Sequence, residues 1–240
     1  MQQQNNSSAH QTMGYDRSSM FSPDGRLLQV EYAKKTVKQG TPIMGIVCKE
    51  GVLLLATKRT LDKLMIIESI EKVFQIDDHV AAAAAGIVSD GRIIIEKAQV
   101  LAQQHRVTYD SPMDIFSLTK EICNIKQAYT QYGGARPFGV SLLVIGVDSK
   151  PRLFLTDPTG IHWEYKATAI GEYEDELKEI LIKEYKENMD LDVAMKLAVN
   201  SLKKVLKKEF NFDKLDGGYI SIKDKKFKKF TKEYLKKCIK

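Results

Sequence analysis

Histidine and cysteine, the side chains that most often bind metal ions or act as nucleophiles, are few and scattered in this sequence. The four histidines have no metal-ligand spacing, and the three cysteines include no Cys-x-x-Cys pair. No glycine-rich phosphate loop is present either. We therefore expect no metal, no cofactor and no use of ATP by this chain. Cys48 and Cys123 lie in apolar stretches that are typical of buried thiols in a reducing compartment.

The polar chemistry of the amino-terminal region is more specific. Tyr15, Asp16 and Arg17 combine a hydroxyl, a carboxylate and a guanidinium, which can form charge-assisted hydrogen bonds. They follow residues 1–14, a Gln/Asn/Ser-rich tail that is too polar to order itself and contains no signal peptide. No stretch approaches the roughly 20 apolar residues that span a bilayer. We expect a cytoplasmic protein without membrane contact.

Lysines near the carboxyl end supply much of the formal charge of +6. Such a run is typical of a solvated surface, so we expect no nucleic-acid binding.

The hydrophobic periodicity predicts a single domain over residues 15–240, in which groups of strands alternate with pairs of helices. We expect helices over residues 26–39, 90–105, 112–129, 174–188 and 191–210 and near the carboxyl end. We expect strands over residues 41–48, 51–57, 72–76, 79–85, 140–147, 152–156, 161–170 and 218–223 and near 226–230. Hairpin-length connections predict antiparallel sheets with helices on their outer faces, which is the α+β class. The pattern alone does not predict the number of layers.

Three local assignments within these elements can be checked. Ala81–Ala85 has helix propensity, but we expect a strand there because side chains this small allow close packing and Gly86 ends the run. Ser111 and Asp190 are expected to cap the helices that follow them.

Four ordered blocks of sequence resemble the alpha-type subunits of the proteasome core particle. The blocks are Tyr15–Arg17 with Phe21–Ala33, then Ser69–Lys72, Tyr129–Gly139 and Tyr165–Gly171. The resemblance covers about residues 15 to 188. It implies the four-layer αββα sandwich of the N-terminal nucleophile hydrolases, extended by an amino-terminal helix. It also implies seven-membered rings that stack on rings of catalytic β subunits.

The same resemblance raises the question of catalysis. Catalytic relatives release a threonine by self-cleavage after a glycine and use its free amine and hydroxyl, with an acidic residue and a lysine nearby. Gly40-Thr41 lies at the matching place, so a self-processed β-type threonine protease is the alternative. However, Lys58 stands at the acidic position beside Lys72, and two lysines without a carboxylate make a poor proton relay. The segment before Gly40 also reads as an ordered helix, so we expect no catalytic residue.

The resemblance implies a gate at the axial entrance of the ring. Residues 1–14 would form the movable plug, and Tyr15, Asp16 and Arg17 would stabilise the open pore. Pro23 would make the next turn rigid, and Tyr32 would contact that turn in the open state.

The loop over residues 131–138 resembles the loop that lines the entrance. It contains Tyr132, Gly133, Gly134 and Arg136, and its glycines and proline suit a tight turn. Contact with a neighbouring copy in the ring is the alternative role for Tyr132 and Arg136.

The resemblance also implies a pocket between neighbouring subunits. Lys72 would bind the terminal carboxylate of an activator tail that ends in a hydrophobic residue, a tyrosine and any residue. A flexible ammonium suits a carboxylate that arrives from solution, and Gly40 and Ile87 would form the walls. The expected partners are neighbouring alpha subunits, β subunits, an ATPase or other activator, and unfolded polypeptide substrates in ubiquitin-type or ATPase-coupled degradation.

Overall fold

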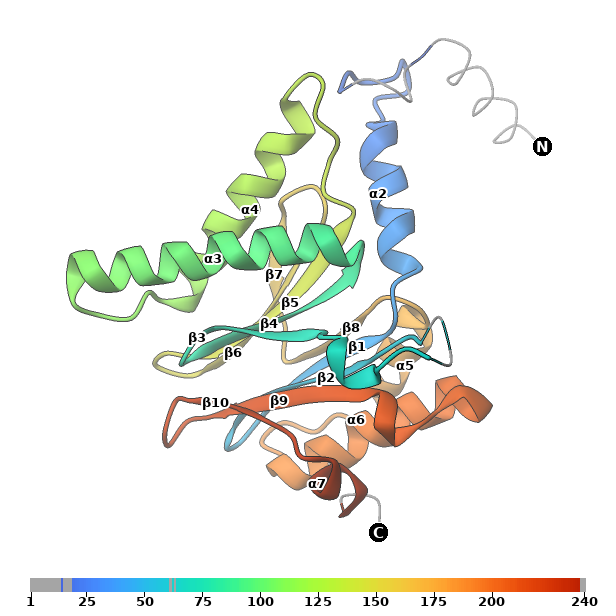
Figure 1. Cartoon of the computed structure of the whole chain (residues 1–240), viewed down its shortest axis with the longest axis vertical. Helices are drawn as coiled ribbons and strands as arrows, with labels where there is room; N and C mark the ends of the chain where they lie inside the picture. Colours follow the sequence, from blue (N-terminus) through green and yellow to red (C-terminus); the bar gives the residue numbers. More distant parts are fainter. Residues whose placement is uncertain (1–13, 15–18, 61, 63, 238–240) are drawn as a thin grey trace.

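Two five-stranded antiparallel sheets lie face to face in the computed structural model, which describes residues 14, 19–60, 62 and 64–237 (Figure 1). The first sheet has the strand order β10-β9-β2-β1-β8. Its strands are β1 (Ile43–Cys48), β2 (Gly51–Thr57), β8 (Ala167–Ile170), β9 (Leu215–Ser221) and β10 (Phe227–Lys229). The second sheet has the order β3-β4-β5-β6-β7. Its strands are β3 (Val73–Asp77), β4 (Val80–Gly86), β5 (Val140–Val147), β6 (Pro151–Thr156) and β7 (His162–Glu164).

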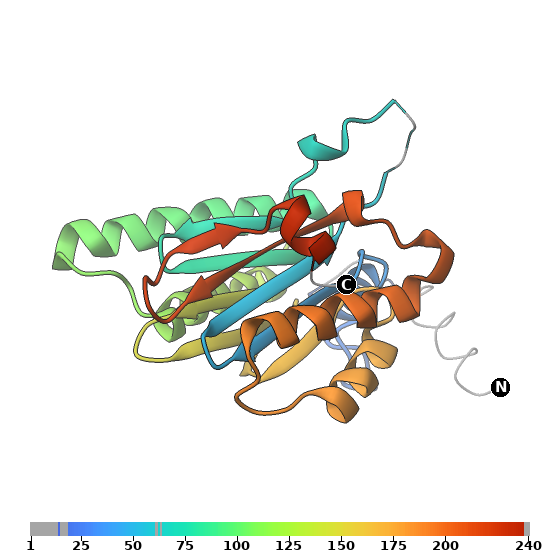
Figure 2. The same ribbon diagram turned by 90° about the horizontal axis from the view of Figure 1, so that it is seen from below.

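Helices cover the outer face of each sheet and complete four layers (Figures 1 and 2). The second sheet is covered by α3 (Val88–Tyr109) and α4 (Ile115–Gln131), and the first by α5 (Glu174–Glu184) and α6 (Leu191–Leu206). Two further helices are α2 (Leu28–Lys38), which contacts β4 and β5, and the short α7 (Lys232–Lys237). The expected αββα sandwich with an additional amino-terminal helix is therefore confirmed.

Apolar side chains fill three parallel cores, one between the sheets and one under each helix layer. Along β2, Val52 and Leu54 face the other sheet, whereas Leu53 and Leu55 face the helices. Because both faces of such a strand are buried, its sequence reads as a continuous apolar run.

The alanine run over residues 81–85 is a strand, as predicted. Its small side chains let α3 approach the sheet closely. A Cβ added to Gly91 would lie 2.7 Å from the Ala84 Cβ, so neither position has room for a larger side chain.

The single strand predicted over residues 161–170 is wrong. β7 pairs with β6 in the second sheet, whereas β8 pairs with β1 in the first. Between them, the Tyr165 amide donates to the Leu153 carbonyl at 2.9 Å, and the Lys166 carbonyl accepts from the Val47 amide at 2.8 Å. The chain therefore crosses from one sheet to the other between adjacent residues, which an alternating pattern that continues through both strands does not reveal.

The predicted helix caps also differ from those in the structure. Asp114, not Ser111, caps α4, because its carboxylate accepts from the Ser117 amide at 2.9 Å. Asp190 occupies the cap position of α6 without a side-chain hydrogen bond, and Glu50 Oε2 instead accepts from the Leu191 amide at 2.8 Å. Glu50 belongs to the β1–β2 hairpin, so this cap depends on tertiary structure.

The structure contains no long apolar helix of the kind that crosses a bilayer, judged over the described part of the chain.

Candidate gate and docking site

A turn leads the chain into α2. The Gly25 amide donates to the Ser22 carbonyl at 2.8 Å, and the Arg26 amide donates to the Ser22 hydroxyl at 3.2 Å. Pro23 lies exposed in this turn. The ion pair between Arg26 and Glu31 then ties the turn to the first turn of the helix. Hydrogen bonds therefore hold this turn at both ends, and the rigidity expected of Pro23 stays a prediction.

The residues before Thr41 are an integral part of the fold. α2 buries Leu28, Val30, Ala33 and Val37, which recur at helical spacing. The helix ends where the Gly40 amide donates to the Val37 carbonyl at 2.9 Å, and the Gly40 carbonyl accepts from the Glu172 amide at 2.7 Å. Thr41 is therefore held in an ordered peptide segment that hydrogen bonds anchor on its amino-terminal side.

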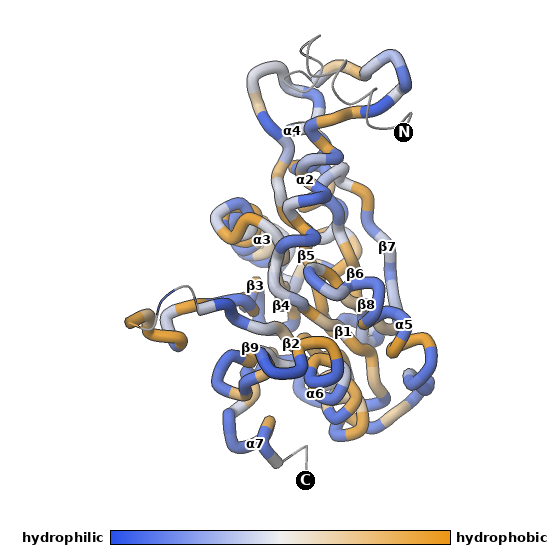
Figure 3. The backbone as a smooth tube through the Cα atoms, turned by 90° about the vertical axis from the view of Figure 1, so that its right-hand side faces the viewer, coloured by the Kyte–Doolittle hydropathy of each residue, from blue (hydrophilic) through white to orange (hydrophobic). Residues whose placement is uncertain are grey.

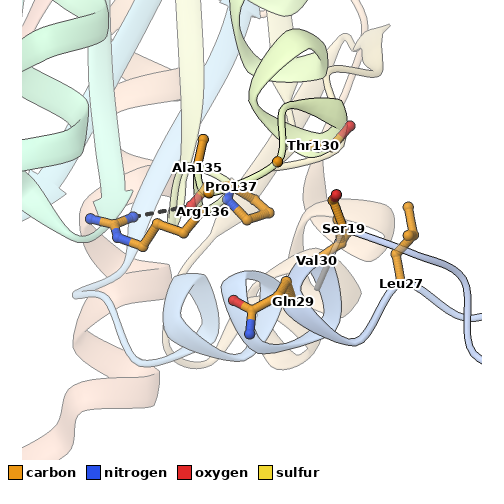
Figure 4. Close-up of a pocket in the computed structure, with 10 residues that line it drawn as sticks. Ser19, Leu27, Gln29, Val30, Thr130, Ala135, Arg136 and Pro137 are labelled. Carbon is orange, nitrogen blue, oxygen red and sulfur yellow. Dashed lines mark hydrogen bonds between the residues drawn. The ribbon is translucent and has the colours of Figure 1, made fainter. Parts of the chain in front are cut away.

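The start of α2 and the loop over residues 131–138 lie side by side at one end of the molecule (Figures 1 and 3). They enclose a pocket of about 380 Å³ (Figure 4). The pocket is lined by Ser19, Leu27, Gln29 and Val30 from one side and by Thr130 and residues 133–137 from the other. The structure thus brings together two of the segments that the sequence assigns to an entrance.

Arg136 is engaged within its own chain. Its Nη1 and Nη2 donate to the two carboxylate oxygens of Asp90 at 2.6 and 2.8 Å, and the guanidinium extends away from Ser19 and Leu27 (Figure 4). The Gly139 amide also donates to Asp90, at 2.9 Å. Burial acts to raise the pKa of Asp90, but these hydrogen bonds outweigh it and hold the pKa below its usual value. The role of Asp90 was missed, because nothing in the sequence links it to a loop more than forty residues away.

Residues 131–134 of this loop are exposed, whereas Pro137 and Phe138 are buried. Tyr132 is exposed, and the added Cβ of Gly133 or Gly134 would meet no atom within 4 Å. Gly134 has φ +80°, a conformation that favours glycine. A side chain would therefore fit at both positions, but the backbone conformation at position 134 favours glycine.

The remaining residues assigned to the gate are placed as follows. Tyr32 lies on the exposed side of α2, with the Lys35 ammonium 5.7 Å from its ring centroid. Tyr15, Asp16 and Arg17 lie outside the described residues. The predicted contact between Tyr32 and the turn in an open pore therefore stays a prediction.

Lys72 is buried just before β3 and reaches the neighbouring strand β4. Its side chain is 4% exposed, and Nζ donates to the Ala84 carbonyl at 2.8 Å. Burial, reinforced by the charge of Arg59, lowers the pKa of Lys72 to about 8. The ammonium of Lys72 is therefore buried in this chain on its own, and its role in binding an activator tail stays a prediction.

The three residues assigned to the docking pocket gather at the end of β4. Lys72 reaches Ala84, two residues before Gly86. A Cβ added to Gly40 would lie 2.4 Å from the Gly86 nitrogen, so only glycine allows this approach. Ile87 follows at the start of α3, half-buried, with its amide donating to the Gly139 carbonyl at 2.9 Å.

A carboxylate that the sequence argument overlooked lies beside Lys58 and Lys72. Asp216, on β9, accepts from the backbone amides of Lys72 at 2.9 Å and Val73 at 3.2 Å, and lies 3.9 Å from Lys58 Nζ. The prediction of two lysines without a carboxylate is therefore wrong, because strand pairing brings in a residue 144 positions away.

Asp216 does not by itself restore the chemistry of a threonine nucleophile. The Thr41 hydroxyl donates to the Thr57 carbonyl at 2.6 Å, and its nitrogen belongs to the peptide bond with Gly40. Among the described residues, no group of three or more His, Cys, Asp or Glu side chains is placed to hold a metal ion.

Comparisons with known proteins agree with this geometry. Residues 37–220 match the proteasome subunit family, and residues 15–35 match the family that describes the N-terminal signature of A-type proteasome subunits. Several similar proteins are named as alpha subunits of the proteasome. The protein from Archaeoglobus fulgidus is 48% identical over 225 residues, which is 93% of this chain and 92% of the relative.

Two further relatives with the same name have similar identity and coverage. The protein from Methanocaldococcus jannaschii is 50% identical over 227 residues, covering 94% of this chain and 87% of the relative. The protein from Methanosarcina acetivorans is 49% identical over 223 residues, covering 92% of this chain and 90% of the relative. The alpha-type signature and these relatives argue against the alternative of a self-processed β-type protease. The chain belongs to the proteasome subunit family and is a non-catalytic, alpha-type subunit of the core particle.

Proposed function

We propose that this subunit forms a seven-membered outer ring, stacked on rings of β-type subunits, and gates the entry of unfolded polypeptides. It would act in the cytoplasm, in ATPase-coupled or ubiquitin-type protein degradation. One observation carries the gating proposal. Ser19 and the start of α2 lie beside the loop over residues 131–138 and enclose a pocket with it, so the beginning of the helix adjoins the segment that would line the entrance.

The braced turn suits a gate because it separates a polar tail from a fixed scaffold. Ser22 and the Arg26–Glu31 pair hold the turn, and four buried residues hold α2 behind it. Rearranging residues 1–14 therefore disturbs little core packing, which keeps both gate states close in free energy. Tyr15, Asp16 and Arg17 would set the tails of neighbouring copies in the open arrangement through charge-assisted hydrogen bonds.

We propose that Lys72 binds an activator tail beside Gly40 and Ile87. The terminal carboxylate would replace the Ala84 carbonyl as the partner of the ammonium, exchanging a neutral acceptor for a charged one. Because the pKa of Lys72 lies at about 8, the side chain is mostly protonated at neutral pH. The buried resting position is compatible with docking if the flexible stem turns toward the carboxylate.

Deletion of the tail tests the gating proposal. Core particles assembled with a β-type subunit should degrade an unfolded protein several-fold faster when residues 2–13 are deleted, because nothing then obstructs the pore. A chain of unchanged length, with Gln2, Gln3 and Gln4 replaced by serine, is the control and should behave as the wild type. Equal rates for the deletion and the wild type, in particles of equal assembly, would contradict a gate in this segment.

A further inference from the structure

Three consecutive apolar side chains project from the loop between β2 and β3. Leu64 is 90% exposed and Ile66 68% exposed, with Met65 between them. We call these three residues the apolar knob. The loop stands out from the body of the molecule, and its tip is among the hydrophobic segments on the outside of the fold (Figures 2 and 3). Exposed apolar residues gathered in this way are typical of a contact surface.

The knob is held in place from both sides. On one side, the Leu64 amide donates to Asp62 Oδ1 at 2.8 Å. On the other, the Ser69 hydroxyl donates to the Ile66 carbonyl at 2.6 Å. These turns fix the local backbone, so a partner would meet a partly preorganised surface, which lowers the entropic cost of binding.

The lysine-rich carboxyl-terminal segment anchors the same loop to the body. Lys229 of β10 lies 2.6 Å from Glu71, and Lys232 of α7 lies 2.9 Å from Glu68. Each pair is half-exposed and contributes little alone, but both cross from the loop to the carboxyl-terminal segment. This gives a structural role to part of a lysine run that the sequence assigned only to solvent.

A partly apolar pocket, which could receive apolar side chains such as those of the knob, lies at the other side of the sandwich. Its apolar lining includes Val37, Leu155, Trp163, Tyr165 and Ile170, and its volume is about 280 Å³. Small-molecule sites commonly measure about 300–1,000 Å³, so this hollow suits one or two side chains better than a ligand. Trp163 is partly exposed, and aromatic residues of this kind are frequent anchors of interfaces. We call this hollow the side pocket.

The strand order places the knob and the side pocket on opposite edges. The loop of the knob leads into β3, an edge strand, and its anchor Lys229 belongs to β10, the edge strand of the other sheet. The side pocket is lined from β7 and β8, which are the opposite edge strands of the two sheets. Figure 3 shows the projecting loop on one side of the molecule and β7, β8 and α5 on the other.

We propose that the apolar knob of one copy of this chain inserts into the side pocket of the next copy. A projection on one edge and a hollow on the other form a head-to-tail contact, and such contacts close into a ring when the rotation between copies is right. The proposal rests on the ring of the proposed function and specifies the contact between its neighbours.

Charge at the two surfaces favours the same pairing. The lining of the side pocket contains three lysines, of which Lys34 pairs with Asp157 and Lys178 with Glu174. Lys38 lies 3.9 Å from Asp175 in a loose, exposed pair, so it is the cation most available at the rim. Lys34 and Lys38 keep more than half of their side-chain surface exposed. Asp62 carries a carboxylate two residues before Leu64, so it would approach this rim as the knob enters. The contact would thus have an apolar centre and a charged edge, as protein interfaces commonly do.

Cross-linking between copies tests the contact directly. A chain with Leu64→Cys and Trp163→Cys, in a Cys238→Ser background, is treated with a short bismaleimide. Cys48 and Cys123 should not interfere, because burial raises the pKa of each thiol to about 11. We expect a ladder of covalent oligomers up to the size of the ring. When the two singly substituted chains are mixed, the covalent products should be dimers and nothing larger, because each chain then has one reactive cysteine.

A matched pair of cysteines controls for random collision. Ile182, on α5, is 82% exposed and lies outside both surfaces. The combination of Ile182→Cys with Trp163→Cys should therefore give only background cross-linking. A Leu64–Trp163 yield no higher than this background, in preparations that contain rings, would overturn the proposal.

Serine substitutions measure the strength of the contact. Leu64→Ser with Ile66→Ser should weaken each contact by about 30-fold, the effect expected if the two side chains together contribute as much as one hot-spot residue. Mass photometry on dilution should then show rings dissociating at higher protein concentration, whereas Ile182→Ser should leave the distribution unchanged. A wild-type chain that forms no ring, alone or with β-type subunits, contradicts the proposed ring itself. Rings that resist both serine substitutions contradict only the contact of the knob with the side pocket.

Discussion

Two buried lysines, Lys72 just before β3 and Lys126 on the inner face of α4, show that similar burial can leave different numbers of hydrogen-bond donors in use. Lys72 is 4% exposed and Lys126 is fully buried. Burial is the main reason why the pKa of each side chain falls to about 8. By burial and pKa alone, the two residues would be indistinguishable.

The hydrogen-bond partners distinguish them. Lys126 Nζ donates to the Thr156 hydroxyl at 2.8 Å, the Val140 carbonyl at 3.0 Å and the Thr156 carbonyl at 3.4 Å. An ammonium has three hydrogens, so Lys126 is fully satisfied. The described residues give Lys72 one acceptor, the Ala84 carbonyl. Lys72 therefore has donor capacity left for an incoming carboxylate, whereas Lys126 ties α4 to β5 and β6.

Removal of Lys126 should have the largest effect on stability. Lys126→Ala leaves a cavity beneath α4 and three acceptors without their donor, which should lower the free energy of unfolding by about 3–5 kcal/mol. Lys126→Met keeps most of the stem and should lose only about 1–3 kcal/mol. Urea unfolding at one fixed protein concentration measures both variants. A loss below about 1 kcal/mol for Lys126→Ala would contradict the claim that Lys126 stabilises the fold by joining α4 to β5 and β6.

The pH dependence of stability gives a second, smaller effect. Both lysines have pKa values of about 8 when folded and an ordinary value of 10.5. Between these values the unfolded chain binds more protons, so their contribution raises stability as pH increases from 8 and is lost as pH falls back through 8. Cys48 and Cys123 act in the opposite direction above pH 9, because their pKa values are raised from 9.0 to about 11.

Between pH 8 and 9 the lysines dominate, although the two thiols, with an ordinary pKa of 9.0, already offset part of their effect. Urea unfolding in this window should show stability rising with pH by about 1 kcal/mol or more. Lys126→Met should remove more than half of this slope, because Lys72 alone then opposes the effect of the two thiols. A slope unchanged by the substitution would show that Lys126 does not carry a lowered pKa.

The sequence predicts the layers of this molecule better than its long-range polar contacts. Strands such as β2 and β4 were predicted correctly because burial on both faces leaves an unbroken apolar run between turn residues. The crossing from one sheet to the other at Tyr165 and Lys166 was missed, because the apolar pattern continues across a change of partner strand.

The candidate site shows the same limit. Gly40, Lys72 and Ile87 were identified by resemblance, and the structure brings them to one end of β4. The burial of Lys72 was not predicted, because it depends on the Ala84 carbonyl across a strand pair. Asp90 and Asp216 were missed for the same reason, since their partners lie 46 and 144 residues away in sequence. Local patterns carry no information on such pairs.

The most direct test of the central claim is the response of assembled core particles to an activator tail. Particles with wild-type chain should degrade an unfolded protein faster when given a peptide that ends in a hydrophobic residue, a tyrosine and any residue. Lys72→Ala should reduce this stimulation at least tenfold in rings that still assemble, whereas Lys126→Met should retain it. Full stimulation of the Lys72→Ala particles would contradict the claim that this lysine is the docking residue.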